Sequence, residues 1–565
     1  MNDRPWLEHY PPGTSPDIEL DSRATLVSMF ERACARFAQR PAFHSFGTTL
    51  TFAELEQRSR QFATFLLGRG FRKGDRISLM MPNILQYPIA LFGALRAGLA
   101  VVNTNPLYTP RELAHQLRDS QAAGIVVLEN FAHVVEQVLG DVQLRTIVTT
   151  QLGDMLHFPR RIVTNWAVRR WKKLVPEFHI DGAITFQDAL AIGAGARART
   201  PEVHGEDLAF LQYTGGTTGI AKGAMLTHRN VAANLEQLAS LWRSFIVEGR
   251  EVVITPLPLY HVFSLTCSCL MFTKLGGLNV LIANPRDIPA FIAELEHWPF
   301  TFISGVNTLY NALLEQPRFR ELDFSRLKLG IAGGMALQPS VAERWAAVTK
   351  QPLLEGYGLT EASPVVACNL PNALQLGSVG FPLPSTEISI RDGDREMDAN
   401  EPGELCVRGP QVMKGYWRNA ADTDKTLDAH GWLRTGDIAT LDATGFLRIV
   451  DRKKDMIIVS GFKVFPNEVE AAIAQHEAVV EVGCVGVPDA RSGQAVKAYV
   501  VARTSTLTEE ELLTHCRQYL TPYKVPKSIE FRETLPKTNV GKILRRMLLD
   551  EPRKASHDDS GAVAH

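Results

Sequence analysis

The chain has 565 residues, of which 45% are hydrophobic and 21% charged, and its formal net charge is −1. Such a length predicts two or three domains, and the average composition excludes disordered, collagen-like and coiled-coil proteins. The balanced charge gives no global sign of nucleic-acid binding.

The seven cysteines are scattered along the chain and form no CxxC pair. We therefore expect a reduced, cytoplasmic protein without a disulfide framework or a zinc site. The N-terminus lacks the apolar core of a signal peptide. Arg96 and Lys274 interrupt the two longest apolar stretches, 87–103 and 265–283, and neither is expected to span a membrane.

Helix and strand patterns alternate through the first half of the chain. A capping-box pattern at Thr51 opens a predicted helix, and a short apolar strand is predicted over 76–81. A second capping box begins at Thr109 and is followed by a predicted strand over 125–128. This alternation predicts an α/β fold with largely parallel sheets.

The segment 158–178 reads FPRRIVTNWAVRRWKKLVPEF, and its six basic residues against Glu177 give a net charge of +5. A helical wheel places Arg161, Arg169, Lys172 and Lys173 on one side and Val163, Ala167, Trp171, Leu174 and Val175 on the other. A basic amphipathic helix with tryptophan suits an anionic membrane surface. The alternative is a helix that packs on the large domain through its apolar side and exposes its basic side.

A loop rich in glycine and threonine, YTGGTTGIAKG at 213–223, follows an apolar strand predicted over 208–211. Glycines let backbone N–H groups converge on phosphate oxygens, while hydroxyls and an ammonium group add donors and charge. The Walker A pattern is absent. The loop predicts phosphate binding through Tyr213, Thr214, Gly215, Gly216, Thr217, Thr218, Gly219, Lys222 and Gly223. A flexible surface loop is the alternative.

Further polar residues fit a nucleotide site. Tyr357, between two glycines, can stack on a flat base, the Thr360 hydroxyl can donate to a phosphate, and Glu361 is an oxygen ligand suited to Mg²⁺. The Asp437 carboxylate can accept two hydrogen bonds from a ribose diol, to which Arg452 could add a donor. Taken alone, Glu361 is more often a solvated surface acid, and Asp437 is as often a residue that stabilises a turn.

A charged run, DRKKD at 451–455, precedes about a hundred residues with their own set of elements. Strands are predicted over 404–408, 446–450, 482–487 and 497–502, and helices over 468–475, from a cap at Thr508, and over 543–549. We expect a large domain at 1–450, a hinge at 451–455, a small domain at 456–550 and a polar tail at 551–565.

The motifs, in this order, resemble those of the adenylate-forming superfamily, which includes acyl-CoA synthetases, firefly luciferase and the adenylation domains of peptide synthetases. Within it, the stretches LQYTGGTTG at 211–219, NPRDIP at 284–289 and VDRKKDM at 450–456 most resemble bacterial long-chain fatty-acid–CoA ligases. The resemblance implies a large N-terminal domain with mixed and parallel sheets and a small α+β C-terminal domain.

The resemblance also implies roles for individual residues. Lys542, on the PKTNVGK loop, would be catalytic together with Glu361 and His261, and Thr214 would join Glu361 as a magnesium contact. The nucleotide site would also include Gly333, Gly334, Glu355, Gly356, Tyr357, Gly358, Leu359, Thr360, Asp437 and Arg452. Ser460, Gly461 and Lys463 would lie on the CoA side, and Lys454 would be the pivot of the hinge.

The implied reaction joins a long-chain fatty acid to coenzyme A, with ATP and Mg²⁺, through an acyl-AMP intermediate. Medium-chain or aryl acids remain alternative substrates, because sequence does not show pocket depth. A fatty acyl-AMP ligase without the CoA step fits less well, since residues 460–463 match the thiol-side pattern. A non-catalytic acyl- or nucleotide-binding protein on this scaffold is the remaining alternative. The expected partners are the anionic lipids at the inner face of the cytoplasmic membrane and a second copy of the chain, as a homodimer.

Overall fold

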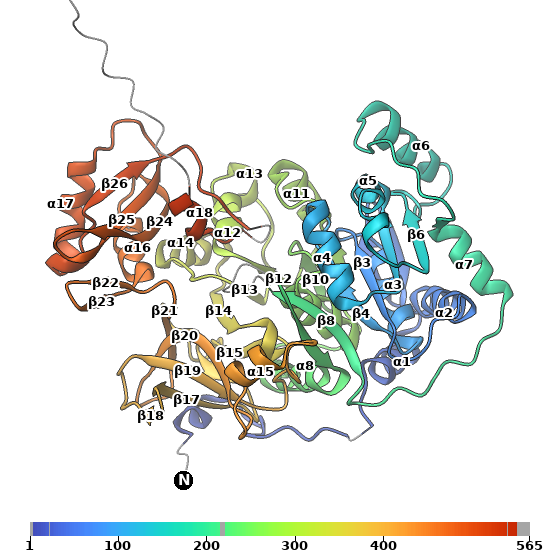
Figure 1. The fold of residues 1–565 in the computed structure, drawn as a ribbon, viewed down its shortest axis with the longest axis horizontal. Coiled ribbons are helices and arrows are strands. Elements are labelled where there is room, and N and C mark those ends of the chain that lie inside the picture. Colours follow the sequence, from blue (N-terminus) through green and yellow to red (C-terminus); the bar gives the residue numbers. More distant parts are fainter. Residues whose placement is uncertain (1–3, 22, 215–220, 539–540, 551–565) are drawn as a thin grey trace, which may run out of the picture. The chain divides into compact units, whose positions relative to one another are not determined.

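A computed structural model describes residues 4–21, 23–214, 221–538 and 541–550 (Figure 1). The chain divides into a large unit, Met1–Thr435 with Ala439–Ile449, and a small unit, Gly436–Ile438 with Val450–His565. The predicted functional division, with a hinge at 451–455, stays a prediction. The predicted tail at 551–565 lies outside the described residues.

The large unit contains two long sheets whose central strands are parallel, which confirms the predicted α/β fold. The order of the first is β7 (Ile184–Thr185), β6 (Thr146–Thr150), β5 (Gly124–Leu128), β3 (Arg76–Met80), β4 (Ala100–Asn103), β8 (Leu208–Thr214) and β9 (Lys222–Thr227). All neighbours in it are parallel except β8 and β9, which form an antiparallel pair.

The second long sheet contains β14, the strand that carries the predicted nucleotide residues 355–358. Its order is β16 (Phe381–Pro382), β15 (Val365–Cys368), β14 (Leu353–Gly358), β13 (Leu329–Ala332), β12 (Phe302–Gly305), β10 (Val252–Thr255), β11 (Leu278–Leu281), β1 (Pro41–Ser45) and β2 (Thr48–Thr51). The run from β14 to β1 is parallel, so the carboxyl ends of these strands share one edge, where ligand sites of α/β sheets usually lie.

The large unit also contains fifteen α-helices within the described residues. They are α1 (Leu26–Phe37), α2 (Phe52–Gly68), α3 (Gln86–Arg96), α4 (Pro110–Ser120), α5 (Ala132–Glu136), α6 (Arg160–Trp166), α7 (Phe186–Gly195), α8 (His228–Trp242), α9 (Val262–Ser264), α10 (Met271–Lys274), α11 (Ile288–Leu295), α12 (Asn307–Leu314), α13 (Pro317–Arg320), α14 (Pro339–Thr349) and α15 (Ala420–Thr426). The capping boxes predicted at Thr51 and Thr109 are both present and fix the starts of α2 and α4.

A third sheet leads from the large unit into the small one. Its order is β18 (Arg395–Glu396), β17 (Glu387–Asp392), β19 (Gly403–Arg408), β20 (Leu433–Leu441) and β21 (Leu447–Arg452). Asp437 lies on β20, and Arg452 ends β21.

The small unit has its own sheet and core. Its strands are β23 (Phe462–Val464), β22 (Ile457–Val459), β25 (Gly493–Ala502) and β24 (Val479–Asp489), with β26 (Ser528–Phe531) beside β25. Its helices are α16 (Pro466–Ala474), α17 (Glu509–Tyr519) and α18 (Arg545–Asp550). Val469, Ile473, Cys484 and Val500 are among the residues buried between the sheet and α16 and α17.

Two helix predictions need correction. The helix expected over 543–549 begins at Arg545, because Leu544 N donates to Pro536 O and Ile543 pairs with Lys537. The helix expected over 158–178 is shorter: α6 ends at Trp166 and a π-helix continues over Ala167–Trp171. In the part of the chain that the structure describes, no helix is both long and apolar enough to cross a membrane. All seven cysteines are buried free thiols.

Candidate active site

The glycine-rich loop joins two antiparallel strands of the first sheet. Thr214 at the end of β8 pairs with Lys222 at the start of β9, and Tyr213 pairs with Gly223. A Cβ atom at Gly223 would lie 3.1 Å from the Tyr213 ring, so glycine permits this close packing. The predicted phosphate-binding residues 215–219 lie outside the described residues.

Helix α4 supports this hairpin from one side. The Tyr213 hydroxyl donates to Asp119 Oδ2 at 2.5 Å, and the Trp417 indole donates to Asp119 O at 3.0 Å. Burial and the neighbouring Asp119 carboxylate raise the pKa of Tyr213 above its usual value. The Tyr213 hydroxyl is therefore held as a neutral donor to Asp119, and its part in phosphate binding stays a prediction.

Lys222 and Glu361 both contact Tyr416, the first over its ring and the second at its hydroxyl. Lys222 Nζ lies 5.5 Å from the Tyr416 ring centroid and 2.6 Å from Asp422 Oδ2. The Tyr416 hydroxyl donates to Glu361 Oε1 at 2.7 Å. Glu361 belongs to a short 3₁₀ helix, Thr360–Ala362, and its carbonyl accepts from Met413 N at 2.8 Å. The loop lysine and the predicted magnesium ligand thus share one aromatic support.

Tyr416 and Asp422 were missed by the sequence analysis. The segment around Tyr416 runs beside β9, with Trp417 N donating to Gly223 O and Met225 N donating to Gly415 O. An aromatic pair directly after a glycine was the available sequence signal, but nothing in the sequence linked it to a loop two hundred residues earlier.

The predicted nucleotide residues of β14 lie beside the end of β13. A Cβ atom at Gly333 would meet Gly356 O at 3.3 Å and the Phe263 ring at 3.2 Å, so these segments touch. The Glu355 side chain is buried and accepts from Leu337 N at 3.0 Å. Burial raises the pKa of Glu355 to about 7. Glu355 therefore holds the turn after Gly334, whereas Tyr357 and Thr360 are only partly buried.

His261 lies on a loop that buried polar side chains hold in place. Tyr87 donates to Leu259 O at 2.9 Å, and Gln212 on β8 donates to Tyr260 O at 2.7 Å. His261 Nδ1 accepts from Phe263 N at 3.3 Å, which leaves Nε2 as the donor nitrogen of the neutral ring. The link through Gln212 ties the His261 loop to the strand that ends at Thr214.

Two predicted residues, Asp437 and Arg452, form an ion pair, and Lys542 lies on a turn of the small unit. Arg452 Nε is 3.6 Å from Asp437 Oδ1. Burial lowers the pKa of Lys542 to about 8; the Arg452 charge acts in the same direction and the Asp437 charge opposes it. The turn that carries Lys542 is closed by hydrogen bonds from Lys542 N to Thr538 Oγ1 and from Thr538 N to Lys542 O.

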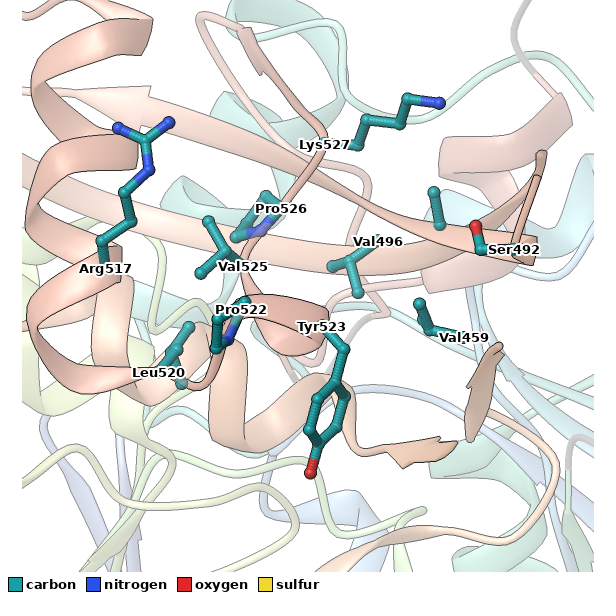
Figure 2. A pocket seen from close by; sticks show the side chains of 11 residues that line it. Val459, Ser492, Val496, Arg517, Leu520, Pro522, Tyr523, Val525, Pro526 and Lys527 are labelled. Atoms are coloured by element: carbon teal, nitrogen blue, oxygen red, sulfur yellow. The ribbon is translucent and has the colours of Figure 1, made fainter. Parts of the chain in front are cut away.

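The predicted CoA-side residues form the tip of the β22–β23 hairpin. Ser460 and Gly461 have φ values of 50° and 86°, and Ser460, Gly461 and Lys463 are exposed. The predicted pivot Lys454 is also exposed, in the turn after β21. A separate cavity of about 660 Å³ in the small unit is lined by Tyr523, Val496, Arg517 and their neighbours, and by no predicted site residue (Figure 2).

Comparisons with known proteins agree with this arrangement. Residues 30–417 match the family described as AMP-binding enzyme, and residues 468–542 match its C-terminal domain. A relative in Salmonella typhimurium named long-chain-fatty-acid–CoA ligase is 55% identical over 97% of this chain and 98% of its own length. One of the same name in Bacillus subtilis is 40% identical over 99% and 100%.

Solved structures show the same fold. The anthranilate CoA ligase AuaEII in complex with anthranoyl-AMP is 25% identical, with a TM-score of 0.83 over 94% of this chain and 97% of its own. ATP-bound MatB from Rhodopseudomonas palustris is 28% identical, with a TM-score of 0.79 over 92% and 98%. The extent of these matches, together with the loop and nucleotide strands described above, shows that the chain belongs to the AMP-binding enzyme family.

Proposed function

We propose that the chain is a long-chain fatty-acid–CoA ligase that works through an acyl-AMP intermediate. The observation that carries the proposal is the convergence of the loop lysine Lys222 and the acid Glu361 on Tyr416, beside the β14 residues that would hold the base. The relatives at 55% and 40% identity carry that name.

The fatty carboxylate attacks the α-phosphorus of ATP, the bond to the β-phosphate oxygen breaks, and pyrophosphate leaves. The Lys542 ammonium would stabilise negative charge that develops on the α-phosphate. Asp437 and Arg452 would hold the ribose, and Tyr357 the base. The CoA thiol then attacks the acyl carbon, loses its proton, and AMP leaves, with Ser460, Gly461 and Lys463 on the thiol side.

The residues present suit Mg²⁺. Among the described residues no three His, Cys, Asp or Glu side chains form a metal-binding cluster. Magnesium in nucleotide sites is typically held by one or two protein oxygens plus substrate phosphates, and the Glu361 carboxylate and Thr214 hydroxyl supply that donor set. When bound, the ion would offset the negative charge of the phosphates.

The test is pyrophosphate release with ATP and Mg²⁺ over fatty acids of increasing length, with and without CoA. We expect turnover that needs CoA, peaks at long chains and collapses in Lys542→Ala. Lys537→Ala is the matched control, since Lys537 lies in the same loop but is ion-paired with Glu481. Loss in both variants would contradict the role of Lys542.

The same assay separates the alternatives. An optimum at medium-chain or aryl acids would keep the mechanism and replace the substrate. Pyrophosphate release without thioester product would indicate an acyl-AMP ligase. No release with any acid would support a non-catalytic binding protein.

We further propose that the segment 158–178 binds anionic membrane surfaces at the inner face of the cytoplasmic membrane. Six large apolar side chains are more than half exposed there: Phe158, Ile162, Val163, Trp166, Trp171 and Leu174. The exposed cations Arg170, Lys172 and Lys173 accompany them. Exposed indoles beside cations are typical of helices that lie in a membrane interface.

The contacts of this segment argue against the alternative of a helix packed through its apolar side. Its inner side is largely polar: Asn165 Oδ1 accepts from Gly153 N at 2.7 Å, and Arg161 donates to Gln187 Oε1 at 3.2 Å. Arg161 therefore does not join the exposed basic side that the helical wheel predicted. Val168 is the one buried apolar side chain between Arg160 and Trp171.

Sedimentation with vesicles of phosphatidylglycerol or of phosphatidylcholine tests the surface. The double variant Trp166→Ser/Trp171→Ser is expected to bind phosphatidylglycerol vesicles at least about tenfold more weakly, because burial of one large apolar side chain is worth about 1.5 kcal/mol or more. Ile192→Ser, at a residue on α7 with 53% exposure, is the control. Equal binding of both variants and wild type would refute the surface. The homodimer stays a prediction, which sedimentation velocity would test.

A further inference from the structure

The turn between β1 and β2 carries an aromatic side chain in an unfavourable backbone position. Ser45 pairs with Thr48, so Phe46 and Gly47 are the two central residues of the turn. Their φ values are 48° and 73°, and two positive values in succession are the pattern of a type I′ turn. Asparagine, aspartate and glycine suit such positions, whereas a bulky side chain at positive φ is disfavoured. The backbone of this turn therefore does not favour phenylalanine.

Burial does not compensate for the backbone conformation of Phe46. The neighbouring side chains of the hairpin are buried: Phe43, His44, Ser45 and Thr48. The Phe46 side chain, at the tip, is 42% exposed. A residue that is held in a disfavoured conformation and also presents its ring to solvent points to a contact outside the fold.

The tip of this hairpin lies against the start of α6, which is at the periphery of the large unit (Figure 1). A Cβ atom at Gly47 would lie 2.9 Å from Arg160 Nη1 and 3.2 Å from Arg160 Nη2, so the guanidinium group rests on the glycine. Phe158, two residues before Arg160, is 77% exposed. Two exposed aromatic residues, far apart in the sequence, therefore lie within two residues of a single contact.

The charge of the two segments is of one sign. Residues 41–53 and 155–176 contain no Asp or Glu, whereas residues 160–173 contain six Arg and Lys. Arg160, Arg170, Lys172 and Lys173 are exposed. Apolar rings that enter the boundary between headgroups and acyl chains, with cations beside the lipid phosphates, are the features of a surface that binds anionic bilayers. The surroundings of Phe46 are thus complementary to anionic lipid.

We propose that the β1–β2 turn is a second point of membrane contact beside the segment 158–178: the Phe46 ring enters the interface of an anionic bilayer, and Arg160, seated on Gly47, binds lipid phosphate groups. This inference rests on the proposed membrane surface of that segment. It adds an element from the other long sheet, because β1 and β2 belong to the second sheet and α6 follows β6 of the first. Contacts from both sheets fix the orientation of the large unit on the bilayer.

The test is sedimentation of the full chain with phosphatidylglycerol vesicles. Phe46→Asn is expected to bind about fivefold more weakly, because the ring is already partly buried and about half of the effect of a large apolar side chain is lost. The same variant is expected to unfold at a higher urea concentration, since asparagine suits the positive φ. Phe46→Trp is expected to bind at least as tightly as wild type. Leu376→Ser, at a residue between β15 and β16 with 43% exposure, is the matched control.

Two further measurements locate the contact. Arg160→Gln is expected to weaken binding to phosphatidylglycerol about fivefold and to leave binding to phosphatidylcholine unchanged, because one cation near an anionic surface is lost. The seven native cysteines are buried, so a fluorophore can be attached selectively to Phe46→Cys. Its emission is expected to be quenched by phosphatidylglycerol that is brominated in the acyl chains, whereas a fluorophore on Leu376→Cys is expected to be unaffected.

Equal binding by Phe46→Asn and wild type, or no quenching at position 46, would overturn the proposal and leave the segment 158–178 as the whole surface. An equal loss of binding in Leu376→Ser would also overturn it, because the effect would not be local. Dimerisation of the wild type that Phe46→Asn abolishes would assign the ring to a contact between copies of the chain instead. Absence of binding by the wild type would refute the membrane surface itself, and the pyrophosphate assay of the ligase function is independent of all these outcomes.

Discussion

The buried carboxyl group of Glu355 predicts a specific pH dependence of stability. Glu355 lies on β14 among the nucleotide residues, and its side chain is buried with one hydrogen bond, from Leu337 N. Burial raises its pKa from the ordinary value of 4.5 to about 7, and the hydrogen bond opposes the shift. The perturbation is Glu355→Gln, which preserves the shape and an acceptor for Leu337 N but carries no titrating proton.

The sign and size of the pH dependence of stability follow from this pKa shift. Between pH 4.5 and about 7 the unfolded chain has lost the Glu355 proton and the folded chain has kept it, so stability falls as the pH rises. A shift of about 2.5 units corresponds to about 3 kcal/mol. The variant lacks this fall, so its free energy of unfolding relative to wild type is expected to rise by about 3 kcal/mol from pH 4.5 to pH 8.

Urea unfolding followed by tryptophan fluorescence on the nucleotide-free protein measures this difference. Glu343→Gln, at an exposed acid on α14, is the control and is expected to show no pH-dependent difference from wild type. The same free-energy difference for Glu355→Gln at pH 4.5 and pH 8 would refute the reasoning. A decrease with pH would show that Glu355 is stabilised as the anion.

Three further predictions concern other groups. Tyr416→Phe removes the hydrogen bond to Glu361. The variant is expected to release pyrophosphate about tenfold more slowly, mainly at limiting Mg²⁺. An unchanged magnesium dependence of the rate would contradict the role of the hydroxyl. Burial lowers the pKa of His228 to about 4, so the folded state binds fewer protons than the unfolded state up to pH 6.5 and stability falls as the pH drops through this range. In the urea assay, the free energy of unfolding of His228→Gln is expected to fall about 3 kcal/mol less than that of wild type as the pH drops from about 6.5 to about 4. An equal fall in the variant and the wild type would argue against a neutral buried ring. Because burial lowers the pKa of Lys542 to about 8, pyrophosphate release is expected to fall about tenfold per pH unit well above pH 8, whereas a flat profile to pH 10 would show that this ammonium is not required.

Much of the fold could be predicted because its signals are local. Capping boxes at Thr51 and Thr109 fix helix starts through contacts three residues apart, and short apolar runs such as 125–128 can only be buried strands or core helices. The motifs are likewise short contiguous segments, and their order can be read along the chain. The family could therefore be identified before any contact was known.

Tertiary structure alone decided which residues support one another. Tyr416 meets Glu361 across 55 residues of sequence, and Gln212 meets the His261 loop across 48, so neither partner is visible in a local pattern. The helical wheel of the segment 158–178 placed Arg161 on an exposed basic side, whereas Arg161 donates to Gln187, because a periodic pattern cannot show which face the rest of the protein covers. That depends on polar contacts such as the one between Asn165 and Gly153, which turn the apolar side chains outward. Sequence by itself therefore determined the elements, the family and the candidate chemistry, whereas packing between distant segments decided which side chains are held, which are buried and which remain exposed.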